Sequence, residues 1–359
     1  MQNNLKGKTI VVGMSGGVDS SVCALLLKQQ GAKVIGLHML GENSATAEDD
    51  KNRVLSICEK LGIKCEVVNY KSEMQVVKDY FIETYKRGQT PNPCVICNRE
   101  VKFKPFVEFA EKLGADFFAT GHYAKIEHDG DKHYLRCAVD SKKDQSYFLC
   151  QLSQKQLKKA LFPLGELTKE EVKKLAEENG FSFESVKESQ DICFLGTEKF
   201  KEFMNKNHPE KAGDIVDYYS GKIVGKHTGI SKYTLGQRKG LGIGGGHGTT
   251  GESWAVTGKD IKKNIVYVCQ GDENALYSNV MLVEGINWIP EKPENEFNCL
   301  ARYRHGQILQ QVEVKLNNNS TAYVRFKEKQ RAISKGQYAV FYKDGSCLGG
   351  GVIAETYSD

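Results

Sequence analysis

The chain has 359 residues, 40% of them hydrophobic and 26% charged, and its formal net charge at pH 7 is +5. This length predicts two or three domains and excludes a single small module, and the composition is that of a globular protein rather than a disordered one. The eleven cysteines are unevenly spaced and do not form the framework of a small secreted domain, so we expect a reduced, cytoplasmic setting. The first apolar stretch ends at Gly13, too early for a signal sequence or a membrane span, which predicts no membrane role.

The first 120 residues alternate short β-rich runs with amphipathic stretches, which predicts an α/β domain around a parallel sheet. We expect strands at Lys8–Met14, Lys33–Met39, Lys64–Asn69 and Ala115–Thr120, and helices at Ser20–Gln30, near Ala45–Leu61, at Ser72–Tyr85 and from about Lys102 to Leu113. We also expect a Pro- and Cys-rich loop at Thr90–Asn98, a hairpin at Lys125–Arg136, and a helix at Thr168–Asn179 whose Thr168 and Glu171 can form a capping box.

Helical periodicity fades beyond about Asn205, and from Gly236 to Gly251 glycines are too frequent for a helix or a regular strand. From Val280 onward short alternating segments recur, which predicts a small antiparallel β-barrel. We therefore expect three domains, with residues 1–205 as the α/β domain, 206–279 as a small β-rich domain and 280–359 as the barrel. Residues 300–359 hold nine Lys/Arg against five acids, an excess that suits contacts to a phosphate backbone.

The most informative segment is Ser15-Gly16-Gly17-Val18-Asp19-Ser20-Ser21, between the first strand and the first helix. Its glycines let a ligand approach the backbone, and the helix that follows offers N–H groups with positive partial charge, so we expect an anion there, most plausibly a phosphate. The segment has neither the lysine of a G-x-x-x-x-G-K-[ST] loop nor the spacing of G-x-G-x-x-G.

Two cysteines differ from the rest because they form a C-x-x-C in a proline-rich turn, at Cys94 and Cys97. Such spacing serves a redox dithiol, half a zinc site or part of an iron–sulfur cluster, and structural zinc is disfavoured because no second matching pair follows. Taken alone, Cys193 would be a core cysteine. The remaining eight are expected to be packing residues: Cys23, Cys58, Cys65, Cys137, Cys150, Cys269, Cys299 and Cys347.

The string SGGVDSS resembles the loop of the ATP-pyrophosphatase superfamily, whose members adenylate a carbonyl or amide oxygen and release pyrophosphate. Further short motifs follow in order over essentially the whole chain, and together they resemble the tRNA-specific 2-thiouridylase family. These motifs are TPNPCVICNREVKF at 90–103, GHYA at 121–124, KDQSY at 143–147, ICF around Cys193, LGQRKGLGI at 235–243, Gly336-Gln337 and CLGGG at 347–351. The resemblance implies a parallel-sheet, adenine nucleotide alpha-hydrolase-like (PP-loop) domain at the amino terminus.

The resemblance further implies an enzyme that adenylates the oxygen on carbon 2 of wobble uridine 34 in tRNA and replaces it with sulfur. It assigns ATP, and a Mg²⁺ ion that Asp19 helps to organise, to the loop: Gly13, Met14, Ser15, Gly16, Gly17, Val18, Asp19 and Ser20. By their position at the ends of the second and fourth strands, Met39 and Gly121 would border the nucleoside at the carboxyl edge of the sheet. The resemblance assigns contacts with the target base or the rest of the tRNA to Asn92, Pro93, Cys94, His122, Lys143, Asp144, Gln145, Arg302, Tyr303 and Gln337. The implied partners are tRNAs of the Lys, Glu and Gln type and an upstream persulfide donor or relay protein.

By the same resemblance Cys97 matches the nucleophile beside the target base, and Cys193 matches the cysteine that carries sulfur as a persulfide. The sequence departs from the pattern at Cys94, where many members have aspartate. Three cysteines, Cys94, Cys97 and Cys193, could instead ligate a four-iron–four-sulfur cluster that holds the donated sulfide. Both interpretations use the same residues, and the sequence does not decide between them.

Two other functions remain open at this stage. An ATP-pyrophosphatase with a non-tRNA acceptor would not need Cys97 and Cys193. A non-catalytic RNA-binding protein would not need an intact SGGVDSS loop. The structural alternative for the basic residues of the barrel is a plain solvated surface, and the alternative for Lys143-Asp144 is a solvated charge pair.

Overall fold

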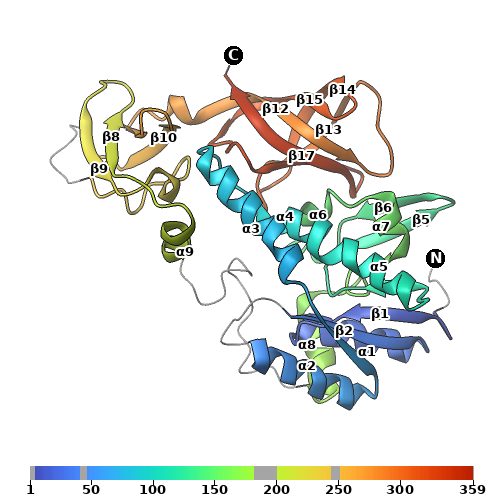
Figure 1. The fold of residues 1–359 in the computed structure, drawn as a ribbon. Helices are drawn as coiled ribbons and strands as arrows, with labels where there is room; N and C mark the ends of the chain where they lie inside the picture. Colours follow the sequence, from blue (N-terminus) through green and yellow to red (C-terminus); the bar gives the residue numbers. More distant parts are fainter. Residues whose placement is uncertain (1–4, 41–46, 182–199, 244–250, 359) are drawn as a thin grey trace.

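The computed structural model describes residues 5–40, 47–181, 200–243 and 251–358 (Figure 1). These residues build a five-stranded sheet of order β3-β2-β1-β4-β7, a four-stranded sheet of order β10-β11-β8-β9, and an eight-stranded sheet that contains a closed barrel. The expected succession of a parallel α/β unit, a small β-rich unit and a β-barrel is therefore confirmed. Among the described helices, none is both long and apolar enough to cross a membrane.

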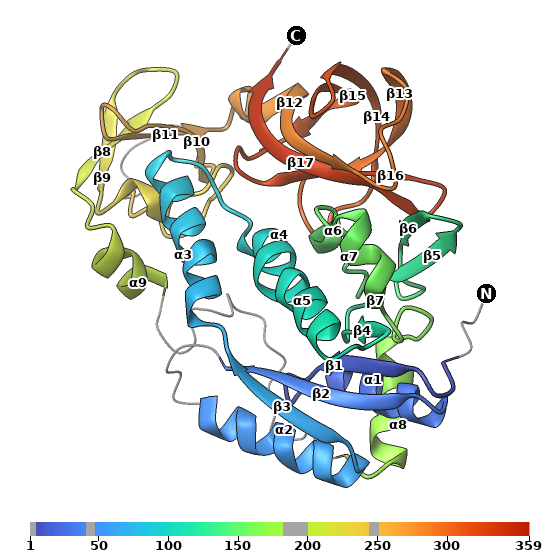
Figure 2. The same ribbon diagram turned by 45° about the vertical axis from the view of Figure 1, so that its right-hand side comes forward.

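All pairings in the first sheet are parallel, and its central strand β1 is covered on both faces. Ile10, Val11 and Val12 of β1 are fully buried, with α5 on one face and α1, α2 and α8 on the other (Figures 1 and 2). The strands are β1 Thr9–Gly13, β2 Lys33–Leu40, β3 Lys64–Asn69, β4 Phe117–Ala119 and β7 Ala160–Leu161. The helices are α1 Val18–Gln29, α2 Ala47–Leu61, α3 Lys71–Lys86, α4 Pro93–Ile96, α5 Lys104–Lys112, α6 Ser146–Leu149, α7 Gln154–Lys159 and α8 Lys169–Glu178.

The expected strands and helices of this unit are present, with ends shifted by a few residues. The capping box of α8 is confirmed, since the Thr168 hydroxyl accepts from the Glu171 N–H and the Glu171 carboxylate accepts from the Thr168 N–H. The expectation of a loop at Thr90–Asn98 is wrong from Pro93 onward, where the chain is helical. Pro93 instead begins α4, because proline is well tolerated in the first turn of a helix, and a π-helical turn, Cys97–Phe103, joins α4 to α5.

The middle unit follows α9, Phe200–Asn207, and consists of β8 Gly213–Asp217, β9 Ile223–His227, β10 Trp254–Asp260 and β11 Ile265–Gln270. Its small core consists mainly of β-branched side chains, among them Ile215, Val256, Val266 and Val268. Between Tyr233 and Trp254 the described residues form neither helix nor strand, in keeping with the expected glycine-rich loop.

The barrel is closed by the pairing of β12 with β17, and the predicted hairpin extends it. That hairpin consists of β5 Lys125–Asp129 and β6 Lys132–Arg136, and Leu135 and Arg136 of β6 pair with Cys347 and Ser346 of β17. The first unit is thus joined to the barrel through a shared sheet. The barrel strands are β12 Tyr277–Trp288, β13 Glu296–Arg302, β14 Gln310–Asn318, β15 Thr321–Arg331, β16 Tyr338–Lys343 and β17 Ser346–Tyr357. Asn279, at the expected domain boundary, lies inside β12, and Asn205 lies inside α9.

Candidate active site

The segment 15–21, called the phosphate loop below, connects the end of β1 to the start of α1, as the sequence predicts. Gly16 has a φ of +79°, a left-handed conformation that favours glycine, and α1 begins at Val18, so Asp19 and Ser20 lie in its first turn. The hydroxyls of Ser20 and Ser21 donate to the Gly17 carbonyl at 3.1 and 2.9 Å. These serines therefore shape the loop, and the α1 N-terminus, which has no side-chain cap, is the feature suited to an anion.

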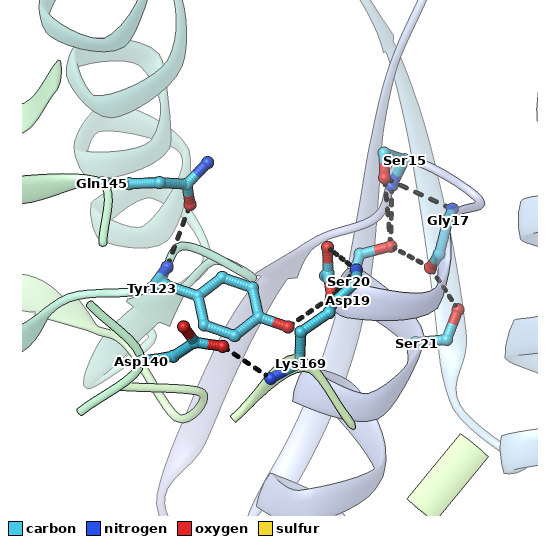
Figure 3. A network of polar contacts seen from close by, with 9 residues as sticks. All are labelled: Ser15, Gly17, Asp19, Ser20, Ser21, Tyr123, Asp140, Gln145 and Lys169. Carbon is cyan, nitrogen blue, oxygen red and sulfur yellow. Dashed lines mark hydrogen bonds and ion pairs between the residues drawn. The ribbon is translucent and has the colours of Figure 1, made fainter. Parts of the chain in front are cut away.

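Asp19 is the centre of a polar network that links the loop to two other segments (Figure 3). Lys169 Nζ lies 2.7 Å from Asp19 Oδ1 and 2.8 Å from Oδ2, and the Tyr123 hydroxyl donates to Oδ1 at 2.8 Å. Lys169 is the first residue of α8, and its backbone N–H donates to Asp140 at 3.0 Å. The Lys169 side chain is 11% exposed and that of Asp19 35%, so this is a half-sheltered ion pair rather than a surface one.

The segment after β4 approaches the phosphate loop closely enough to require a glycine. A Cβ on Gly121 would lie 2.9 Å from the Asp19 carbonyl carbon and 3.0 Å from the Ser20 nitrogen. β2 and β4 flank β1 in the sheet, and Met39 lies near the carboxyl end of β2. The three segments expected to bind the nucleotide therefore meet at the carboxyl edge of the sheet, where open α/β sheets bind ligands.

The C-x-x-C cysteines lie within one continuous helical stretch formed by α4, the π-helical turn and α5. Cys94 is exposed, whereas Cys97 is 4% exposed and belongs to the main hydrophobic core. Asn92 is the N-cap of α4, and the Cys97 N–H bonds to the Pro93 and Cys94 carbonyls. π-helical turns are uncommon and occur frequently at functional sites. Cys193 lies outside the described residues.

Most of the other cysteines behave as packing residues. Cys23, Cys58, Cys150, Cys269, Cys299 and Cys347 are buried. Burial raises the pKa of the Cys299 thiol to about 12 and that of Cys269 to about 11, so these side chains remain protonated thiols at neutral pH.

Several residues assigned to tRNA by the resemblance make contacts within the protein. The buried Asp144 carboxylate accepts from the Ala138 N–H at 3.0 Å and the Ser146 hydroxyl at 2.8 Å, and it lies 3.6 Å from Arg302 Nη1 in the barrel. The Arg302 guanidinium also lies 5.5 Å from the centre of the Tyr342 ring. Asp144, which is buried, and Arg302, whose side chain is 15% exposed, thus form an ion pair between the first unit and the barrel.

Gln145, Gln337 and Tyr303 are likewise bonded to protein groups. Gln145 Oε1 accepts from the Tyr123 N–H at 3.0 Å, while Gln337 Nε2 donates to the Thr90 and Pro91 carbonyls at 3.0 and 2.9 Å. The Tyr303 hydroxyl donates to Gln330 at 3.2 Å. These bonds define what the side chains do in the protein without RNA, and contact with tRNA stays a prediction.

The His122 ring lies at the same sheet edge, with its centre 5.7 Å from that of Phe103 and 6.0 Å from that of Phe162. Its Nδ1 is 2.8 Å from the Thr120 hydroxyl. Burial, with a smaller effect from the positive charge of Lys102, lowers the pKa of His122 well below its usual range. The imidazole is therefore neutral at physiological pH.

Three family models match the chain in succession. Residues 8–197 match the tRNA methyl transferase HUP domain, residues 201–270 the tRNA methyl transferase PRC-barrel domain, and residues 278–353 the aminomethyltransferase beta-barrel domain. The tRNA-specific 2-thiouridylase MnmA of Alkaliphilus oremlandii is 45% identical over 97% of this chain and 97% of its own length. The enzyme of the same name from Oceanobacillus iheyensis is 47% identical over 98% of this chain and 96% of its own. The chain belongs to the tRNA-specific 2-thiouridylase family.

The similarity to solved structures is much weaker than the similarity to these family members. The U34-tRNA thiolase NcsA from Methanococcus maripaludis, solved with its [4Fe-4S] cluster, covers 58% of this chain and 70% of its own, at 23% identity and a TM-score of 0.36. A similarity of this size carries no conclusion about a cluster in this chain.

The sequence did not predict that Lys169 and Tyr123 bind the Asp19 carboxylate. Tyr123 lies inside the GHYA motif, in which only Gly121 and His122 were expected to contact a ligand. Lys169 had a local signal, because a lysine in the first turn of a helix opposes the helix dipole and is unfavourable there without another partner. Its partner Asp19 is 150 residues earlier in the chain, so the pairing itself could not be predicted.

Proposed function

We propose that the chain is an ATP-dependent tRNA-uridine 2-sulfurtransferase that converts the wobble uridine of tRNA to 2-thiouridine. The observation that carries the proposal is the combination of an uncapped helix N-terminus at the sheet edge, closely approached by Gly121, with a buried C-x-x-C cysteine. Family membership supports the thiolation reaction over the methyl transfer in the name of the domain model. A thiol nucleophile and an adenylating loop are both needed for thiolation.

The proposed reaction solves a leaving-group problem. The oxygen on carbon 2 of uracil leaves poorly, so it first attacks the α-phosphorus of ATP, which releases pyrophosphate and makes AMP the leaving group. A persulfide sulfur on Cys193 then attacks carbon 2 and AMP departs. The Cys97 thiolate attacks the Cys193 sulfur, which frees the thiocarbonyl and leaves a Cys97–Cys193 disulfide. An external thiol must reduce that disulfide before the next turnover.

The proposal assigns the phosphates of ATP to the loop, with Met39 and Gly121 bordering the nucleoside. Among the described residues Asp19 does not form a preformed Mg²⁺ site, because both of its carboxylate oxygens already bind the Lys169 ammonium. The ion would be held chiefly by the phosphates of the nucleotide, as is usual for Mg²⁺. Its contribution would be to offset the negative charge of the triphosphate.

An iron–sulfur cluster on Cys94, Cys97 and Cys193 is the alternative sulfur carrier. Among the described residues no group of three or more His, Cys, Asp or Glu could hold a metal ion, so such a cluster would require Cys193. Anaerobic purification followed by iron and sulfide analysis separates the two schemes. Metal-free protein that thiolates tRNA at the full rate would eliminate the cluster, whereas iron and sulfide lost together in Cys94→Ser would support it.

The test of the function itself is mass spectrometry of wobble nucleosides after incubating tRNAs of the Lys, Glu and Gln type with the protein, ATP and a persulfide donor. We expect the mass gain of one oxygen-to-sulfur exchange, dependent on ATP and absent in Cys97→Ser. Cys65→Ser is the matched control, because Cys65 is a half-buried thiol on β3 with no assigned role. Unmodified uridine under all conditions would refute the proposal.

A further inference from the structure

A turn of the barrel holds the segment that precedes the C-x-x-C cysteines. The turn is formed by residues 334–337 before β16, and the segment, residues 89–92, connects α3 to α4; Figure 2 shows this connection running past the barrel. The Thr90 N–H donates to the Lys335 carbonyl at 2.9 Å, and Gln337 Nε2 donates to the carbonyls of Thr90 and Pro91. Three hydrogen bonds therefore join two pieces of chain that are almost 250 residues apart.

The side-chain amide nitrogen of Gln337 donates to two backbone carbonyls. A glutamine amide nitrogen carries two N–H groups, and both are used here, at 3.0 Å to Thr90 and 2.9 Å to Pro91. Pro91 is buried, and a buried carbonyl without a partner is costly, so the two bonds stabilise this path of the backbone. A contact between Gln337 and RNA through the same nitrogen would require these bonds to break.

The turn is also fitted to the segment sterically. Gly336 has a φ of +87°, and a Cβ there would lie 2.9 Å from both the Gln89 Cβ and the Thr90 oxygen. Next to it, the Tyr338 carbonyl accepts from the hydroxyl of Tyr147, at 2.9 Å. The barrel and the first unit therefore meet here without room for even a methyl group.

The position of this segment determines where the buried cysteine lies. The Asn92 N–H donates to the Tyr80 hydroxyl at 3.4 Å, Asn92 occupies the N-cap position of α4, and the Cys97 N–H bonds back to the Pro93 carbonyl. Displacement of residues 90–91 would therefore shift the start of α4 and with it Cys97. We propose that Gln337 is a positioning residue that fixes the Cys97 segment for the chemistry; its catalytic consequence rests on the thiolation proposed above.

The experiment measures the accessibility of Cys97 without substrate. Gln337→Met keeps the length of the side chain but has no donors, and Gln337→Glu keeps its shape but presents acceptors to the two carbonyls. Alkylation by iodoacetamide is followed at Cys97 by peptide mass spectrometry, with the exposed Cys94 as the internal reference. We expect Cys97 alkylation to become about tenfold faster in both variants, the factor that corresponds to losing two modest hydrogen bonds. Gln310→Met is the matched control, because the Gln310 amide bonds locally to Ile308.

Thiolation kinetics give the second readout. A positioning role predicts a fall in kcat with the KM for tRNA changed less than twofold, and an unchanged far-UV circular dichroism spectrum at the assay temperature verifies that the variants are folded. Unchanged Cys97 alkylation in both variants would overturn the proposal, as would a raised KM for tRNA with kcat preserved, which would make Gln337 an RNA contact. Because alkylation needs neither ATP nor tRNA, faster alkylation in a protein that proves inactive would support the positioning and refute only the thiolation.

Discussion

Replacing Lys169 by methionine tests whether the ion pair with Asp19 maintains the phosphate loop. Methionine keeps most of the side-chain volume, so the change removes the ammonium and little packing. Hydrogen bonds to charged groups contribute about 1.5–3 kcal/mol, and the 35% exposure of Asp19 lets water replace part of the loss. We therefore expect the free energy of unfolding of the first unit to fall by about 1–2 kcal/mol, which lowers its melting temperature by about 2–8 °C.

The same substitution should weaken ATP binding. Without Lys169 the Asp19 carboxylate is an uncompensated negative charge in the first turn of α1, where the triphosphate is expected to bind. We expect about tenfold weaker ATP binding, which corresponds to about 1.4 kcal/mol. Thermal unfolding over a series of ATP concentrations measures both quantities, because a ligand that binds the native state raises the melting temperature.

Lys174→Met is the control for this experiment. It makes the same chemical change on the same helix, but at an exposed pair with Glu178 whose atoms are 3.8 Å apart, so it should change stability by less than about 0.5 kcal/mol. The reasoning is refuted if Lys169→Met matches Lys174→Met in both stability and ATP affinity. It is also refuted if ATP binds more tightly to Lys169→Met, since the lysine would then oppose binding, for example by competing with a metal ion for Asp19.

Three further predictions concern other parts of the site. Gly121→Ala should destabilise the protein by about 1–3 kcal/mol and abolish thermal stabilisation by ATP, because the added Cβ would clash with the backbone of the phosphate loop. The control is Gly258→Ala, where an added Cβ would have no neighbouring atom closer than 3.9 Å. Equal behaviour of the two variants would contradict the steric argument. The pKa of His122 is lowered in the folded protein, so as the pH falls the unfolded chain takes up the His122 proton first. Proton uptake by the unfolded chain lowers the free energy of unfolding, which is therefore unaffected by His122 above about pH 6.5 and falls below that pH. Urea unfolding between pH 7.5 and 5 should therefore show a shallower loss of stability in His122→Asn than in the native protein, by at most about 1.4 kcal/mol per pH unit, and parallel curves would argue against a lowered pKa of His122. Arg302→Met should cost about 3 kcal/mol in urea unfolding because it leaves Asp144 charged and buried between the units, and a loss below about 0.5 kcal/mol would show that the pair is not a structural link.

The local features of the fold were predictable because short-range patterns determine them. The buried Ile10–Val12 run, the glycines of the phosphate loop and the Thr168 capping box each act within a few residues, and the structure has each of them where the sequence predicts it. The start of α4 differs from the expected loop because prolines favour loops in general, whereas Pro93 is compatible with the first turn of a helix. The hairpin of β5 and β6 was predicted from its turn residues, but its pairing with β17 was not.

The sequence alone therefore determined the order of the three units, the anion-binding loop and the family, because motif order and local propensity do not depend on distant contacts. Only the tertiary structure decided how the site is held together. It pairs Asp19 with Lys169, places Arg302 against Asp144 and joins Gln337 to the Thr90 and Pro91 carbonyls. Each of these contacts joins residues about 150 to 250 positions apart, and which of many possible charged or polar partners meet is settled only when the sheet, the helices and the barrel pack together.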